Sequence, residues 1–273
     1  MQALAVIPAR WASARFPGKP LALLAGRPMI EHVYRRALRA RTVGRVVVAT
    51  DDERIARAVR AFGGEVRMTS PAHPSGTDRV AEAARGEAAP VVVNVQGDEP
   101  LLHPEDIDAA VRPLFGENPP EMSTLAIPLA GPEDFLDPNV VKVVVGKGGD
   151  ALYFSRAPIP HPRDALGSAP AGAPGLRAGW AGLRPRPLKH LGLYAYRREY
   201  LLRYASLPPT PLELAERLEQ LRALEDGARI RVVGIGRDSI GVDVPGDLER
   251  LLADPALRAA LEEEVGKWPS TSS

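Results

Sequence analysis

Short apolar runs alternate with amphipathic stretches through the first half of the chain. Three runs have the length of a buried strand, namely residues 3–7, 45–49 and 91–95. The stretches that follow them repeat apolar side chains at helical spacing, namely residues 28–39, 52–62, 77–85 and 104–114. Strands that alternate with helices predict right-handed βαβ units and a mainly parallel sheet flanked by helices. Because ligands bind beyond the carboxyl ends of such strands, we expect function in the loops that follow them.

The second half is richer in strands and less regular. Strand patterns cover residues 121–128, 140–145, 151–155, 188–196 and 229–235, and helical patterns cover residues 197–204 and 211–226. Residues 158–187 are rich in Pro, Gly and Ala, which predicts a flexible excursion and not a domain linker. We therefore predict an α/β fold with one domain over residues 1–253, followed by a C-terminal helix and tail over residues 254–273.

The composition narrows the possible partners. The chain has 273 residues, and its 35 basic and 34 acidic side chains give a net charge of only +1. Nothing in that balance favours nucleic acid or an anionic membrane, so an anion site has to be local. There is no cysteine, no apolar run of about twenty residues and no signal-peptide pattern at the start. We expect a cytoplasmic protein that binds neither nucleic acid nor membrane.

The loop after the first predicted strand carries three cations, Arg10, Arg15 and Lys19, among small residues. A triphosphate needs several cations and a close approach of the backbone, which Gly18 permits. Arginine forks suit phosphate oxygens, and a lysine acts as a point charge on a departing pyrophosphate. The spacing alone is also compatible with a solvated basic loop, and the loop follows neither the Walker nor the dinucleotide-binding pattern.

Two aspartates follow apolar segments and are candidates for a metal site. Asp98 lies just beyond the run at residues 91–95, and Asp243 stands in the sequence GVDVPGD. A carboxylate beyond a buried strand can hold Mg²⁺ against phosphate oxygens. From the residues alone, Asp98 could equally stabilise a turn and Asp243 could cap a helix.

The second half offers polar side chains in regular patterns. Alternation puts His190 and Tyr194 on one face of their predicted strand, and Arg156 closes another strand. On the predicted helix over residues 211–226, the spacing places Leu214, Leu218 and Leu221 toward the core and Glu213, Glu216 and Gln220 in a polar stripe. Each pattern also has a purely structural interpretation, as a core histidine, a surface arginine or a solvated helix face.

Five blocks in order resemble the 3-deoxy-manno-octulosonate (Kdo) cytidylyltransferase family, the CMP-Kdo synthetases. The blocks are PARWASARFPGKPL from residue 8, HPSGTDR from residue 73, QGDEP from residue 96, HLGLYAYR from residue 190 and PLELAERLEQLR from residue 211. Trp11, Ala14 and Phe16 depart from the family's more usual residues in the first block, and Pro74 does so in the second. The resemblance runs from residue 1 to about residue 250.

The resemblance implies a three-layer nucleotidyltransferase sheet with a smaller mixed β excursion for sugar binding and dimerisation. It also implies that the anomeric hydroxyl of Kdo attacks the α-phosphorus of CTP, which gives pyrophosphate and CMP-Kdo for lipopolysaccharide synthesis. The implied CTP contacts are Arg10, Ser13, Arg15, Lys19, Ser75, Arg79, Gln96 and Asp98. The implied Kdo contacts are Arg156, His190, Tyr194, Glu213 and Gln220. Asp98 and Asp243 would jointly hold Mg²⁺, and with Arg15 and Lys19 they form the implied catalytic set. A homodimer is expected.

Three other functions compete with this one. An acylneuraminate cytidylyltransferase shares the first loop, but the QGDEP and HLGLYAYR blocks are typical of the Kdo enzymes. A nucleotide-binding regulatory module without turnover would be expected to lack the metal aspartates, and both are present. A hexose-1-phosphate pyrophosphorylase would usually begin with a glycine-rich segment, where this chain has Pro8-Ala9-Arg10. The sequence does not decide between Kdo and an 8-amino analogue.

Overall fold

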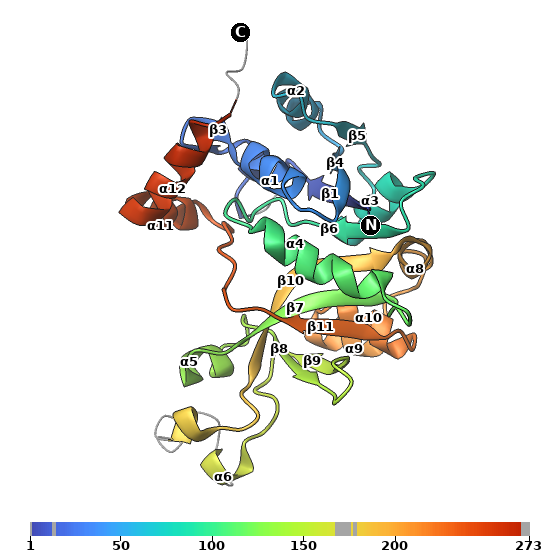
Figure 1. The fold of residues 1–273 in the computed structure, drawn as a ribbon, viewed down its shortest axis with the longest axis vertical. Coiled ribbons are helices and arrows are strands. Elements are labelled where there is room, and N and C mark those ends of the chain that lie inside the picture. Colours follow the sequence, from blue (N-terminus) through green and yellow to red (C-terminus); the bar gives the residue numbers. More distant parts are fainter. Residues whose placement is uncertain (1, 13–14, 167–175, 177–178, 269–273) are drawn as a thin grey trace. The chain divides into compact units, whose positions relative to one another are not determined.

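The computed structural model describes residues 2–12, 15–166, 176 and 179–268 (Figure 1). Within the span predicted as a single domain, the chain forms two compact units. Residues 1–112 and 239–273 make up the first unit, and residues 113–238 make up the second. In the part of the chain that is described, no helix combines the length and the apolar character needed to cross a membrane.

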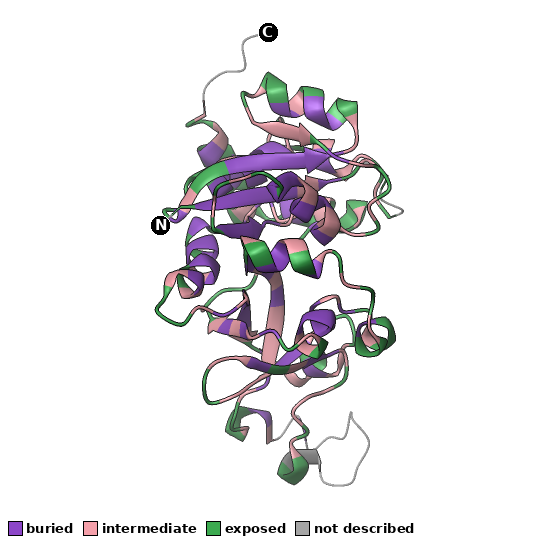
Figure 2. Ribbon diagram, turned by 90° about the vertical axis from the view of Figure 1, so that its right-hand side faces the viewer, coloured by how far each residue is buried: buried purple, intermediate pink, exposed green. Residues whose placement is uncertain are grey.

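The first unit is built on four parallel strands in the order β6-β1-β4-β5. These strands are β1 (Ala3–Ala9), β4 (Val43–Thr50), β5 (Val66–Met68) and β6 (Val91–Asn94). The apolar runs that predicted β1, β4 and β6 are buried, as the purple ribbon in Figure 2 shows. The parallel sheet predicted from the alternation is confirmed.

Each of these strands is followed by a helix, as the apolar spacing predicts. They are α1 (Met29–Leu38), α2 (Glu53–Ala61), α3 (Gly76–Ala84) and α4 (Pro104–Val111), followed by the 3-10 turn η2 (Arg112–Phe115). Polar residues mark where two of them begin. Asp52 accepts the backbone N–H of Arg54 at 2.9 Å, and Ser75 accepts that of Asp78 at 3.2 Å. A short 3-10 turn, η1 (Lys19–Leu21), and a hairpin of β2 (Leu23–Leu24) and β3 (Arg27–Pro28) lie between β1 and α1.

The C-terminal segment returns to the first unit and packs on the hairpin and α1. It contains α11 (Pro245–Ala253) and α12 (Pro255–Val265), which confirms the predicted C-terminal helix. One apolar cluster joins Leu24, Met29, Val242, Leu251 and Leu261. An ion pair between Arg36 and Glu264 reinforces it, with both side chains only 10% exposed, and Arg39 contacts the same carboxylate at 2.9 Å. Segments more than 200 residues apart in sequence are therefore locked together.

The second unit has a mixed sheet. Its strands are β7 (Met122–Pro128), β8 (Lys142–Val145), β9 (Ala151–Ser155), β10 (Leu188–Arg197) and β11 (Ile230–Gly234). β11 runs parallel to β7, whereas the pairs β7–β10, β10–β8 and β8–β9 are antiparallel. Its described helical segments are α5 (Pro132–Leu136), α6 (Arg163–Leu166), η3 (Trp180–Gly182), α8 (Arg198–Tyr204), α9 (Pro211–Glu216) and α10 (Gln220–Glu225). Much of the excursion predicted at residues 158–187 lies outside the described residues.

The single helix predicted over residues 211–226 is wrong. The chain breaks at Arg217, whose φ of 54° is in the left-handed region, and this separates α9 from α10. The break rotates the two halves out of one helical register. Leu214, predicted to face the core, is 54% exposed, while Glu213 and Gln220 of the predicted polar stripe are buried.

We predict that Glu264→Ala destabilises the protein by about 3 kcal/mol, because it leaves the buried Arg36 guanidinium without its carboxylate. Urea unfolding measures the change. Glu263→Ala is the matched control, because its pair with Lys267 is exposed, and it should leave the unfolding midpoint where it is. Equal effects of the two variants would contradict the assignment of a stabilising role to the buried pair.

Candidate active site

A pocket of about 420 Å³ opens in the first unit where β1 and β6 end. The predicted residues that line it are Arg10, Arg15, Lys19, Gln96, Asp98 and Asp243, and Gly76 at the start of α3 also borders it. The two strands are neighbours in the parallel sheet, so the loops after their carboxyl ends meet at one edge. The structure thus gathers six of the predicted site residues around one cavity.

Opposite charges converge at the centre of this pocket. The Lys19 ammonium lies 2.6 Å from an Asp98 carboxylate oxygen and 3.5 Å from an Asp243 carboxylate oxygen. The Arg15 guanidinium contacts the same oxygen of Asp243 at 3.2 Å. Although 145 positions separate the two aspartates in the sequence (243 minus 98), both lie within reach of one ammonium group.

The backbone fixes how Asp243 reaches the pocket. The N–H of Val242 donates to the carbonyl of Asp98 at 2.9 Å, which joins the two loops directly. The carboxylate of Asp247, at the start of α11, accepts the N–H groups of Asp243 at 2.7 Å and Val244 at 2.9 Å. These backbone donors lower the pKa of Asp247. The turn that presents Asp243 is therefore held on both sides.

The donor set of the pocket fits a magnesium ion. Mg²⁺ commonly uses one or two carboxylates and completes its shell with water and substrate phosphates, and Asp98 and Asp243 are such a pair. Among the described residues, no cluster of three or more acidic or histidine side chains could form an all-protein metal cage. Binding of Mg²⁺ by these two residues stays a prediction.

Trp11 and Gly18 shape the cationic loop. The N–H of Gly18 donates to the carbonyl of Trp11 at 3.0 Å, and the indole ring lies so close that a β-carbon on Gly18 would be 3.0 Å from it. On the α2 side, the Arg54 guanidinium lies 3.5 Å from the centre of the Trp11 ring, a cation–π contact. Asp52 in turn holds Arg54 through both carboxylate oxygens. No sequence pattern indicated this support from α2. Ser13, a predicted CTP contact, lies outside the described residues.

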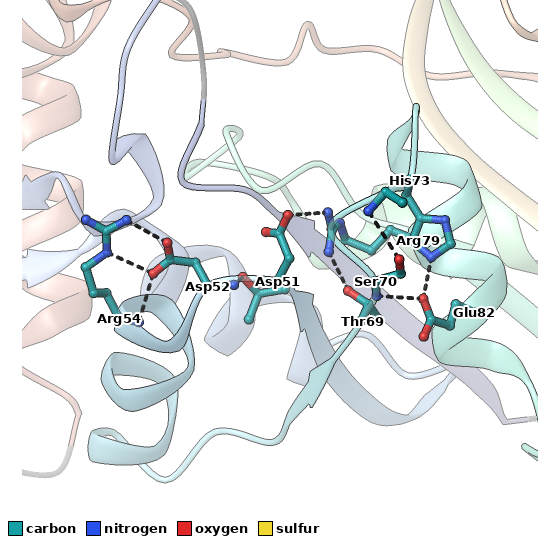
Figure 3. A network of polar contacts seen from close by, with 10 residues as sticks. Asp51, Asp52, Arg54, Thr69, Ser70, His73, Arg79 and Glu82 are labelled. Carbon is teal, nitrogen blue, oxygen red and sulfur yellow. Dashed lines mark hydrogen bonds and ion pairs between the residues drawn. The ribbon is translucent and has the colours of Figure 1, made fainter.

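Arg79, another predicted CTP contact, is in the interior. Figure 3 shows its guanidinium between Asp51, 3.0 Å away, and the hydroxyl of Thr69, and its exposed fraction is 0%. These partners follow β4 and β5, so Arg79 ties the start of α3 to two neighbouring loops. The nucleotide contact itself stays a prediction.

The same figure shows His73 paired with Glu82 of α3. Glu82 also accepts the N–H of Ser70 at 2.9 Å, and these bonds lower the pKa of Glu82, the backbone bond most. Ser75, predicted to contact CTP, caps α3 through its bond to Asp78. The block over residues 73–79 therefore fixes the beginning of α3 beside the pocket.

The second unit brings His190 and Tyr194 together as the strand alternation predicts. Their ring centroids are 5.3 Å apart, and Phe154 of β9 lies 5.1 Å from His190. Burial lowers the pKa of His190 to about 3, so its imidazole is neutral near pH 7. Burial likewise raises the pKa of Tyr194. These rings can exchange hydrogen bonds with a ligand but carry no charge.

Arg156 is anchored at the end of β9. Its guanidinium donates to the carbonyl oxygens of Glu216 at 2.7 Å and Pro138 at 3.0 Å. The Glu216 carboxylate accepts the N–H of Arg156 at 2.9 Å and the hydroxyl of Ser155 at 2.6 Å. Much of the donor capacity of Arg156 is thus used to hold the end of α9 next to Arg217. A sugar contact for Arg156 stays a prediction.

Glu213 and Gln220 flank the break between α9 and α10. Glu213 pairs with Arg222 at 2.5 Å and accepts the N–H of Thr210 at 3.2 Å, so it closes the beginning of α9. Gln220 is buried at the start of α10. Contact of Glu213 or Gln220 with a sugar stays a prediction.

Lys142 is a buried cation that no sequence pattern singled out. It is fully buried at the start of β8, and its ammonium donates to the carbonyl oxygens of Asp137, Val140 and Arg156 at 2.8, 2.6 and 2.6 Å. Burial lowers its pKa. The sequence signal for this buried lysine was its position at the start of the apolar run KVVV. A charge buried in such a run needs hydrogen-bond partners.

A strand-end pocket that joins a cationic loop to paired carboxylates defines a nucleotide-binding α/β enzyme. The chain belongs to the cytidylyltransferase family, which residues 4–230 match. A protein from Geobacter sulfurreducens named 3-deoxy-manno-octulosonate cytidylyltransferase is 56% identical over 92% of this chain and 98% of its own length. A protein of the same name from Geobacter metallireducens is 54% identical over 92% of this chain and 97% of its own. The resemblance seen in the sequence is confirmed.

Solved structures agree with this assignment. The structure of a CMP:2-keto-3-deoxy-manno-octonic acid synthetase complexed with CTP superposes with a TM-score of 0.83 at 42% identity, over 97% of this chain and 100% of the other. The inositol-1-phosphate CTP transferase of T. maritima has a TM-score of 0.60 at 12% identity, over 98% of both chains, and shares the fold. The predicted nucleotidyltransferase fold class is confirmed.

We predict that Gly18→Ala weakens CTP binding about tenfold, because the residue has a φ of +72° and the new β-carbon would press on the Trp11 ring. Calorimetric titration with CTP measures the loss. Gly26→Ala is the matched control, since it has a similar φ of +76° but open space around it. If both variants bind CTP equally well, the ring contact does not shape the loop.

Proposed function

We propose that this protein transfers CMP from CTP to the anomeric hydroxyl of Kdo and releases pyrophosphate. One observation carries the proposal: the Lys19 ammonium joins Asp98 and Asp243 beside the cationic loop at the ends of β1 and β6. The names of the similar proteins supply the nucleotide and the sugar acid. CMP-Kdo would supply an activated sugar for lipopolysaccharide synthesis.

The cationic loop does the electrostatic part of the reaction. Transfer of a phosphoryl-type group requires little covalent help from the protein, so alignment and neutralisation of oxygen charge carry the catalysis. Arg15 and Lys19 already face the two carboxylates, and we assign them to the departing pyrophosphate. Arg10 and Gln96 line the same pocket and are assigned to the nucleotide. No side chain is needed as a nucleophile.

Asp98 and Asp243 would hold the magnesium ion. When bound, Mg²⁺ would neutralise charge on the phosphate oxygens. The turn at Asp243 is fixed by Asp247 and by the backbone of Asp98, so the protein presents both carboxylates with little rearrangement.

The polar face of the second unit is assigned to the sugar acid. His190 and Tyr194 offer neutral hydrogen-bonding groups on one face, which suit the hydroxyls of an eight-carbon sugar. Arg156 supplies positive charge for a carboxylate, with Gln220 as a further contact and Glu213 as support. The resemblance to the Kdo enzymes supports this assignment. The same resemblance supports our proposal that the protein works as a homodimer in the cytoplasm.

A substrate panel tests the proposal. With CTP and Mg²⁺, we expect pyrophosphate release with Kdo and rates at least about a hundredfold lower with acylneuraminate and hexose 1-phosphates, because unsatisfied polar groups in a site penalise the wrong sugar. A coupled pyrophosphate assay gives the rates, and its blank omits the sugar. Turnover of a hexose 1-phosphate without turnover of Kdo would refute the proposed reaction. An 8-amino analogue of Kdo in the panel decides between the two sugars.

Removal of the charge of either pocket carboxylate should slow turnover strongly. We expect Asp98→Asn and Asp243→Asn to lower kcat by about a hundredfold or more, because each removes a charged oxygen that holds the ion. Initial rates across a Mg²⁺ titration measure the effect. Glu53→Gln, which alters an exposed pair with Arg60 on α2, is the control and should keep the parent rate. Near-normal rates in either aspartate variant would remove that residue from the metal site.

A further inference from the structure

Thr124 of β7 joins three groups of β10 through one hydroxyl. Its side chain is fully buried, with an exposed fraction of 0%. The oxygen lies 3.0 Å from the carbonyl oxygen of Leu191, 2.9 Å from that of Leu193 and 3.0 Å from Nε2 of His190. Neither the sequence patterns nor the proposed mechanism gives Thr124 a role.

A β-bulge creates this arrangement. Leu191 pairs with Leu125, whereas the next paired residue of β10, Tyr194, pairs with Thr124. Residues 192–193 are therefore extra on β10, and the carbonyl groups on either side of Gly192 both face the Thr124 hydroxyl. Bulges commonly re-aim side chains next to active sites. Here the extra pair of residues also keeps His190 and Tyr194 on the same face.

The hydrogen count decides the direction of the bond to His190. A threonine hydroxyl has one proton, and carbonyl oxygens only accept. If that proton pointed to Nε2, two buried carbonyl oxygens would face the lone pairs of Thr124 at about 3 Å without a hydrogen between them. The stable arrangement gives the Thr124 proton to the carbonyls and makes Nε2 of His190 the donor. Because the ring is neutral, its other nitrogen, Nδ1, then carries the lone pair.

We infer that Thr124 is a positioning residue that holds His190 in the Nε2–H tautomer, so that Nδ1 is a hydrogen-bond acceptor for a hydroxyl of the sugar acid. Within the described residues, the side chain of His190 forms its hydrogen bond with Thr124 through Nε2. Nδ1 is therefore left to accept from a ligand. The part that concerns the sugar rests on the proposed function. The tautomer itself depends only on the contacts around Thr124.

Nitrogen NMR of ¹⁵N-histidine-labelled protein at pH 7 reads the tautomer directly. The chain has five histidines, and His190→Asn assigns the signals of His190. We expect the pattern of an Nε2–H imidazole in the parent protein and in Thr124→Ser, which keeps the hydroxyl. Thr124→Val has the same shape but lacks the hydroxyl oxygen that accepts from Nε2–H, so it should raise the population of the Nδ1–H form. An Nδ1–H or doubly protonated ring in the parent protein would overturn the inference, even if Thr124→Val did not fold.

Steady-state kinetics test separately whether the His190 tautomer matters for binding of the sugar acid. Thr124→Val should raise KM for Kdo about tenfold and leave KM for CTP unchanged, because only the acceptor at His190 is altered. Thr124→Ser should keep both KM values of the parent protein. Thermal unfolding checks that both variants fold. An unchanged tautomer in folded Thr124→Val would remove Thr124 from the positioning role, and an altered tautomer with unchanged KM would remove Nδ1 from sugar binding. If the parent protein did not use Kdo, the proposed function would fail while the NMR result stood.

Discussion

The contact between the Lys19 ammonium and the carboxylates of Asp98 and Asp243 is the constraint around which the pocket of the first unit is built. Two carboxylates repel each other unless a positive charge lies near both. Lys19 provides that charge from the loop after β1, while Asp98 follows β6 and Asp243 arrives from the C-terminal segment. The bond from Val242 to Asp98, the turn held by Asp247 and the pairing of Arg36 with Glu264 all keep this third segment in place.

The second unit uses buried charge for a different purpose. Lys142 and Arg156 direct their protons to backbone carbonyl groups, and Glu216 accepts from the backbone and from Ser155. Where the backbone is irregular, its N–H and C=O groups lack the partners that a helix or sheet provides. A buried N–H or C=O group without a partner costs free energy. The hydrogen bonds of Lys142, Arg156 and Glu216 therefore satisfy backbone groups from the end of β9 to the break at Arg217. At the bulge of β10 the neutral side chain of Thr124, which also contacts His190, provides the hydrogen-bond partner for the backbone carbonyl groups.

Local patterns in the sequence predict much of this structure. Apolar alternation located the strands of the first unit, and the cationic loop with Asp98 located the pocket. The break at Arg217 was not predictable, because the leucine spacing continues through it and the carbonyl groups at the break accept from Arg156, some 60 residues earlier. The burial of Arg79 was hidden for a similar reason, since its partners follow two other strands. The pairing of Asp98 with Asp243 came from the family resemblance, as spacing says nothing about contacts between distant segments.

The first unit is discontinuous in sequence, and this imposes an order on its assembly. Residues 1–112 supply the sheet and the cationic loop, but residues 113–238 must be synthesised before the chain returns with Asp243, α11 and α12. A chain still emerging from the ribosome therefore holds Lys19 and Asp98 without the third member of the pocket. The carboxylate pair forms only after residue 243 has left the exit tunnel. Synthesis of the second unit therefore precedes completion of the pocket, because Asp243 is the last of its lining residues to be made.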